Sequence, residues 1–119
     1  MARALGMLVA GWAPLAQGLL AGKETAWSTE AQRAIAAEVA DVAHQLDRTP
    51  AQVALAWSMA KGVVPVIGST KVEQLHDSLG AAGFTLPEDH LVRLDAASSI
   101  EPGYPHDFLA LKADTLGPV

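Results

Sequence analysis

The sequence contains no cysteine among its 119 residues. It therefore has neither a disulfide framework nor a thiolate metal site, which fits a reducing compartment. Basic residues are also few: eight lysines and arginines stand against thirteen acidic residues, and the net charge is −5. This balance disfavours nonspecific binding to nucleic acid, so no nucleic-acid partner is expected.

Long hydrophobic runs are missing as well. Glycine and proline at Gly11, Pro14 and Gly18 interrupt the apolar start of the chain, and no small-residue cleavage site follows cleanly. No uninterrupted stretch reaches the roughly 18 residues of a membrane span. We expect a cytoplasmic protein with no membrane partner. Half of the residues are hydrophobic, so the chain should fold, and its length allows one domain, residues 1–119.

Helix signals are clear in the middle of the chain. Ser28 or Thr29 is expected to cap a first helix whose apolar residues recur at helical spacing. That buried stripe consists of Ile35, Val39, Val42 and Leu46. Thr49, followed by proline, predicts the start of a second, largely buried helix, because Gln52 can reach back to complete a capping box.

The most informative stretch is residues 63–79, VVPVIGSTKVEQLHDSL. A β-rich run, Val63–Ile67, meets a small-residue turn, Gly68–Thr70, and we expect Thr70 and Glu73 to form a capping box at the start of the next helix. Free N–H groups and the positive end of a helix dipole suit such a turn to an anion. An ordinary strand-to-helix connection is the alternative, because many α/β proteins have such a turn without a ligand.

Other apolar segments complete the expected fold. Met7–Trp12 predicts a short buried strand. The helix after the small-residue turn is expected to bury Val72, Leu75 and Leu79. A last firm helix is expected from Pro87, with Asp89 and Arg93 paired at i,i+4. The tail is expected to hold a short helix from His106 to Ala113.

Common catalytic and metal motifs are absent from the sequence. The four histidines show no His-x-His or HExxH spacing, and there is no GxSxG, no Walker loop and no GxGxxG. We therefore expect no metal site and assign no catalytic residue.

Two segments carry a resemblance to a known family. TPAQVALAWSMAKGVVPVIGSTKVEQLHDSL, residues 49–79, resembles the C-terminal part of the aldo/keto reductase family, and LVAGWAPLAQGLLAGK resembles its seventh barrel strand and the following loop. The resemblance implies an α/β fold: the C-terminal portion of a (β/α)8 TIM barrel, helix-dominated, with two short parallel strands. It covers nearly all of this chain, which in turn covers about the last third of the family fold.

The resemblance also implies a cofactor, NADP(H), with NAD(H) not excluded. Trp12 falls where an aromatic residue stacks on the nicotinamide, and Ala13 stands where serine is usual. Asp77 and Ser78 fall where two residues hold the adenine edge. The implied cofactor-binding residues are Trp12, Ala13, Pro14, Leu15, Ile67, Gly68, Ser69, Thr70, Lys71, Gln74, Asp77 and Ser78. Many members have arginine at the position of Thr70, so binding of the 2′-phosphate of NADP(H) is expected to be weakened, with Lys71 as the only nearby cation.

In the family, a hydride moves from the nicotinamide to a carbonyl while a tyrosine donates the proton. That tyrosine and its Lys, Asp and His partners come from early barrel strands, and Tyr104, the single tyrosine here, does not match that position. We therefore expect an NADP(H)-binding portion of an aldehyde- or ketone-reducing oxidoreductase, incomplete for catalysis alone. The alternatives are a non-catalytic binding or interaction module, or an inactive fragment. Because two strands make a marginal sheet, self-association is expected.

Overall fold

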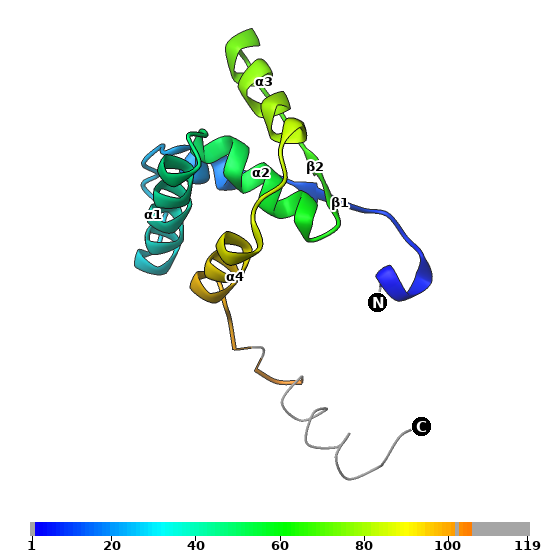
Figure 1. Cartoon of the computed structure of the whole chain (residues 1–119). Helices are drawn as coiled ribbons and strands as arrows, with labels where there is room; N and C mark the ends of the chain where they lie inside the picture. The colour runs from blue at the N-terminus through cyan, green and yellow to red at the C-terminus, as the bar shows by residue number, and fades with distance from the viewer. Residues whose placement is uncertain (1, 102, 106–119) are drawn as a thin grey trace.

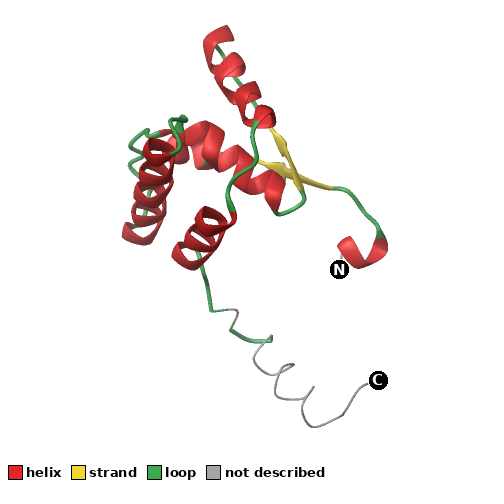
Figure 2. Cartoon of the chain, in the orientation of Figure 1, coloured by secondary structure: helices red, strands yellow, loops and turns green. Residues whose placement is uncertain are grey.

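The computed structural model describes residues 2–101 and 103–105 (Figures 1 and 2). Its α-helices are α1 (Glu30–Gln45), α2 (Pro50–Ala60), α3 (Val72–Leu79) and α4 (Glu88–Ala97). Its strands are β1 (Val9–Trp12) and β2 (Val63–Val66), and the 3-10 helices are η1 (Arg3–Leu5), η2 (Ala16–Ala21) and η3 (Gly80–Gly83). The helix expected at 106–113 lies outside the described residues.

The two strands form a parallel pair, which confirms the expected pair of short parallel strands. Val9 lies opposite Val63, and Trp12 lies opposite Val66. Parallel strands need a long crossover, which η2, α1 and α2 provide here. A Cβ atom at Gly11 would lie 2.7 Å from the Cγ1 atom of Val63, so this close approach requires glycine.

The core lies among α1, α2 and α4. The expected stripe of α1 is confirmed, since Val39 and Val42 are fully buried and its other two members are half-buried. Val53 of α2 and Leu94 of α4 complete the fully buried centre. Trp57 packs against this core while half-buried, and its Nε1 donates to Asp95 Oδ1 at 2.9 Å.

The helix caps were predicted correctly for α1 and α2 but not for α3. Capping boxes are present at the starts of α1 and α2. The cap predicted at Thr70 is wrong, because α3 has Lys71 as its N-cap and no side-chain cap bond. The Ser69 hydroxyl instead accepts from Lys71 N at 3.3 Å and donates to Lys71 O at 2.6 Å. This local hydroxyl turn competes with the cap that Thr70 would make.

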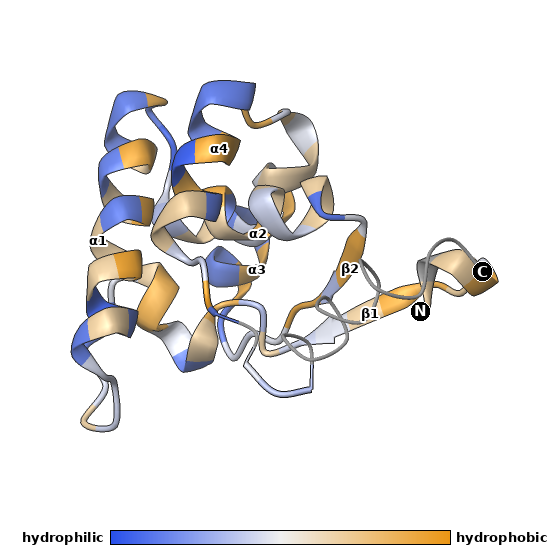
Figure 3. Cartoon of the chain, turned by 90° about the horizontal axis from the view of Figure 1, so that it is seen from below, coloured by the Kyte–Doolittle hydropathy of each residue, from blue (hydrophilic) through white to orange (hydrophobic). Residues whose placement is uncertain are grey.

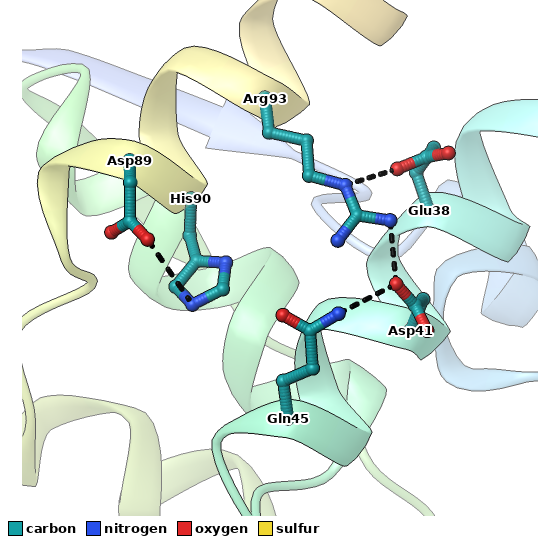
Figure 4. A network of polar contacts seen from close by, with 6 residues as sticks. All are labelled: Glu38, Asp41, Gln45, Asp89, His90 and Arg93. Carbon is teal, nitrogen blue, oxygen red and sulfur yellow. Dashed lines mark hydrogen bonds and ion pairs between the residues drawn. The ribbon is translucent and has the colours of Figure 1, made fainter.

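A polar network joins α4 to α1 (Figure 4). Arg93 Nε donates to Glu38 Oε2 at 2.6 Å, and Arg93 Nη2 donates to Asp41 Oδ2 at 2.5 Å. The two carboxylates, Asp41 first, raise the pKa of Arg93. The pair expected between Asp89 and Arg93 is therefore wrong: two acids across the helix interface offer the guanidinium more charge-assisted bonds than one neighbour does.

The strand side of the molecule leaves its apolar side chains exposed, contrary to the sequence-based expectation. Trp12 and Leu8 are 84% and 80% exposed. The stripe of α3 that was expected to be buried, Val72, Leu75 and Leu79, is exposed. The physical reason is that α3 packs on α2 and η3 with its other face and projects from the helical core (Figure 1). The strands likewise extend apolar residues away from the helices (Figure 3).

No helix within residues 2–101 is both long enough and apolar enough to cross a membrane.

Candidate functional site

A cleft of about 690 Å³ lies at the carboxyl ends of β1 and β2, between the start of α2 and one side of α3. Its volume is in the range of small-molecule sites, and this end of parallel strands is where α/β proteins bind ligands. The lining residues are Trp12, Ala13, Pro14, Leu15, Gln17, Gly18, Ala21, Lys23, Thr49, Pro50, Ala51, Val66, Ile67, Gly68, Gln74, Asp77 and Ser78.

Most of the residues predicted to bind the cofactor meet in this cleft. Those that line it are Trp12, Ala13, Pro14, Leu15, Ile67, Gly68, Gln74, Asp77 and Ser78. The remaining three, Ser69, Thr70 and Lys71, lie in the adjoining exposed turn and do not line it. The parallel pairing of β1 with β2 therefore joins two segments that are more than fifty residues apart in sequence.

Trp12 ends β1 and presents its side chain to the outside. Its exposure of 84% shows that Trp12 does not pack in a core formed by the described residues. The backbone after it is strained, because Ala13, Ala16 and Gln17 adopt φ angles of 51°, 48° and 58°. Non-glycine residues rarely occupy this region, and such strain gathers at functional sites.

The sequence reasoning did not identify the cation that lines the cleft. Lys23 lines the cleft, whereas Lys71, the cation expected there, does not. Lys23 comes close because the loop folds back: its backbone N donates to Gly18 O at 3.0 Å. A Cβ at Gly18 would lie 2.7 Å from Lys23 Cδ. The signal was available, since Lys23 closes the family-like segment LVAGWAPLAQGLLAGK.

The carboxylate of Asp77 is held by the start of α2. Thr49 Oγ1 donates toward both of its oxygens, at 2.9 Å to Oδ2 and 3.0 Å to Oδ1. Gln52 Nε2 donates to Asp77 Oδ1 at 3.1 Å and to the backbone O of Asp77 at 3.0 Å. Sequence reasoning assigned Thr49 and Gln52 to capping alone, so it missed this contact between helices.

Metal binding finds no support in this part of the molecule. No group of three or more histidine, aspartate or glutamate side chains within the described residues could hold a metal ion.

Comparison with known proteins decides the family. The sequence model of the aldo/keto reductase family matches residues 1–99. The chain belongs to the aldo/keto reductase family. Members of this family generally bind a nicotinamide dinucleotide and carbonyl substrates.

Curated relatives of this aldo/keto reductase chain include oxidoreductases. It is 38% identical over 107 residues to the uncharacterized oxidoreductase YrpG of Bacillus subtilis, covering 79% of this chain and 33% of that protein. It is 29% identical over 119 residues to norsolorinic acid reductase of Aspergillus flavus, covering 92% of this chain and 31% of that protein. The chain thus spans about a third of the length of these relatives.

Solved structures confirm the fold. The glycerol dehydrogenase AKR11B4 from Gluconobacter oxydans matches with a TM-score of 0.70 at 20% identity, covering 87% of this chain and 39% of that chain. The apo form of Gox0644 matches with a TM-score of 0.66, also at 20% identity, covering 84% of this chain and 32% of that chain. The described elements are therefore the C-terminal portion of a (β/α)8 barrel, helix-dominated, with two short parallel strands.

Proposed function

We propose that the cleft binds NADP(H), with NAD(H) as the alternative, as the dinucleotide site of a carbonyl-reducing oxidoreductase. The observation that carries this proposal is the meeting of the Trp12–Leu15 segment with the Ile67–Ser78 segment in one cleft at the carboxyl ends of the strands.

Each part of the dinucleotide has a chemically suitable partner among the lining residues. The exposed indole of Trp12 offers a flat face on which a nicotinamide ring can stack. Lys23, the one cation among the described lining residues, can contact the phosphates. Gly68 lets a phosphate approach the backbone closely. Asp77 and Ser78 offer oxygen acceptors to an amino group of the base.

We infer only a modest preference for NADP(H) over NAD(H). Lys23 and Asp77 are the charged groups among the described cleft residues, so their formal charges cancel. The additional phosphate of NADP(H) thus gains little net attraction inside the cleft. Lys71 in the adjoining turn is a point charge and lacks the paired donors with which arginine holds a phosphate.

Carbonyl reduction by this chain alone is not expected. A bound nicotinamide supplies the hydride, but the carbonyl oxygen must also receive a proton from a nearby acid. The described cleft residues include no tyrosine and no histidine. We propose that these residues bind and orient the dinucleotide and that the proton donor belongs to another part of the barrel, so NADPH consumption with a simple aldehyde should be undetectable.

A non-catalytic interaction module remains the second candidate, favoured by the exposed apolar side chains on the strand side. Val64, Val72 and Leu79 are 47%, 78% and 57% exposed, and none of them lines the cleft. Exposed apolar patches of this kind mark interaction sites. We propose that this side is covered by association with a second copy of the chain. The two candidates are compatible, because these apolar side chains do not line the cleft that is proposed to bind the dinucleotide.

Tryptophan fluorescence tests dinucleotide binding directly. NADPH should quench the emission of the chain, and Trp12→Phe should remove most of that quenching. Trp27→Phe is the matched control, because Trp27 is 90% exposed and lies outside the cleft. Free tryptophan corrects for absorption by NADPH. Absence of quenching at millimolar NADPH, or an equal loss in both variants, would overturn the proposal.

A further inference from the structure

The capping box at the start of α2 differs from the matching box of α1, because its residues also contact α3. Both boxes pair a threonine with a glutamine three residues later. At α1 the hydrogen bond from the threonine backbone to the glutamine side chain is short, with Thr29 N donating to Gln32 Oε1 at 2.9 Å. At α2 the same bond, Thr49 N to Gln52 Oε1, is stretched to 3.5 Å. Because a normal N–H···O bond is about 2.9–3.0 Å long, the glutamine of α2 is displaced from ideal capping geometry.

The displacement of Gln52 is explained by its contacts with α3. Its Nε2 donates to the backbone O of Asp77 at 3.0 Å and to Asp77 Oδ1 at 3.1 Å. Thr49 Oγ1, which accepts from Gln52 N at 3.2 Å, donates toward both carboxylate oxygens. A threonine hydroxyl has one proton and an ionised carboxylate about four acceptor sites, so Asp77 keeps the capacity to accept from a ligand.

Gly80 leaves room for the Gln52 side chain in this position. Its φ of −58° is ordinary helical backbone, which any residue can adopt. A Cβ there would nevertheless lie 2.4 Å from Gln52 Nε2. Glycine at this position therefore provides space for the glutamine amide and not conformational freedom.

We propose that Thr49 and Gln52 are positioning residues that fix the Asp77 carboxylate in the cleft to accept an N–H from the exocyclic amine of a purine base. The inference rests on the proposed dinucleotide site and adds the residues that hold its base-end acceptor in place. Thr49 and Asp77 both line the cleft, while Gln52 does not line it and acts through its bonds to Asp77. If these bonds only held α2 and α3 together, their loss would change the affinity for all dinucleotides equally. If they position Asp77, their loss lowers the preference for a dinucleotide whose base carries the amino group.

The test compares NADPH with deamino-NADPH, in which an oxygen replaces the amino group of the base. Both are titrated against the full chain by tryptophan fluorescence. Wild type should prefer NADPH by about tenfold, the value of one hydrogen bond to a charged acceptor. Gln52→Met should reduce this ratio to about one, and Gln32→Met, the matched loss at the other capping box, should retain it. Gly80→Ala, which crowds Gln52 without removing it, should lower the ratio too.

Thermal denaturation of each variant shows that it is folded, and Gly80→Ala decides the question if Gln52→Met does not fold. Failure of wild type to bind either dinucleotide overturns the proposed site and this inference with it. Binding of both with equal affinity supports the proposed site and overturns the inference, because Asp77 then makes no selective hydrogen bond with the amino group of the base. An undiminished preference in Gln52→Met or Gly80→Ala also overturns the inference alone.

Discussion

The helical side of the molecule and its strand side both carry apolar stripes, yet they bury them to very different extents. Val39, Val42 and Leu94 on the helical side have no exposed surface, whereas Val72 and Trp12 on the strand side are 78% and 84% exposed. An amphipathic pattern thus predicts that the apolar face of an element will be covered, but it does not predict what covers that face. The helical side covers itself, while the strand side leaves apolar side chains exposed, and there we propose that a dinucleotide and a second copy of the chain bind.

Polar contacts differ between the two sides in the same way. The helices are joined by Arg93 with its two acids and by an ion pair between Lys61 and Asp95. Among the described residues, Asp77 of α3 is hydrogen-bonded to the first turn of α2. The stability of the helical side and the ligand-binding properties of the strand side should therefore respond to different substitutions.

The largest expected effect is on the helical core. Leu94→Ala should lower the free energy of unfolding by about 2–5 kcal/mol, because it removes a fully buried side chain and leaves a cavity. Val92→Ala on the same helix is the control: its side chain is 60% exposed, so the change should stay within about 0.5 kcal/mol. Urea unfolding followed by circular dichroism measures both. Equal losses of unfolding free energy in the two variants would mean that Leu94 of α4 is not part of the core.

A smaller effect is expected on association through α3. Val72→Lys combined with Leu79→Lys should shift the chain toward the monomer and leave that monomer folded, because both side chains are exposed in the single chain. Glu73→Lys adds a lysine to the same helix at an exposed polar position and should leave association unchanged. Light scattering after size-exclusion chromatography measures the result. A stable wild-type monomer would contradict the proposed association.

The smallest effect is expected from Asp95. Hydrogen bonds from Lys61, first, and from Trp57 hold the pKa of this carboxyl below its ordinary value of 3.8. A lowered folded-state pKa contributes stability above the ordinary value, and that contribution is lost as pH falls through the folded-state pKa. Asp95→Asn should therefore lower the melting temperature slightly at neutral pH and flatten its acid decline below about pH 4. Glu101→Gln, at an exposed carboxyl, should not flatten the acid decline as Asp95→Asn does.

The sequence was most informative where structure is local. The capping box at Thr49 and a cap at Ser28 or Thr29 followed from short patterns, whereas the pair of parallel strands followed from the resemblance to the aldo/keto reductase family. Arg93 was assigned to the wrong partner because i,i+4 spacing describes neighbours on one helix and gives no information about acids on another helix. Lys23 was missed because a loop that folds back leaves no periodic signal. The burial of α3 was predicted wrongly because its stripe needs a cover that the described residues do not include.

The measurement that tests the central claim most directly is a two-dimensional amide NMR titration of the full chain with NADPH. The account predicts that amide chemical shifts change at cleft residues, while the amides of α1 and α4 keep theirs. The cleft residues concerned are Trp12, Ala13, Leu15, Ile67, Gly68, Gln74, Asp77 and Ser78. Unchanged spectra at saturating NADPH, or changes concentrated on α1 and α4, would contradict the account.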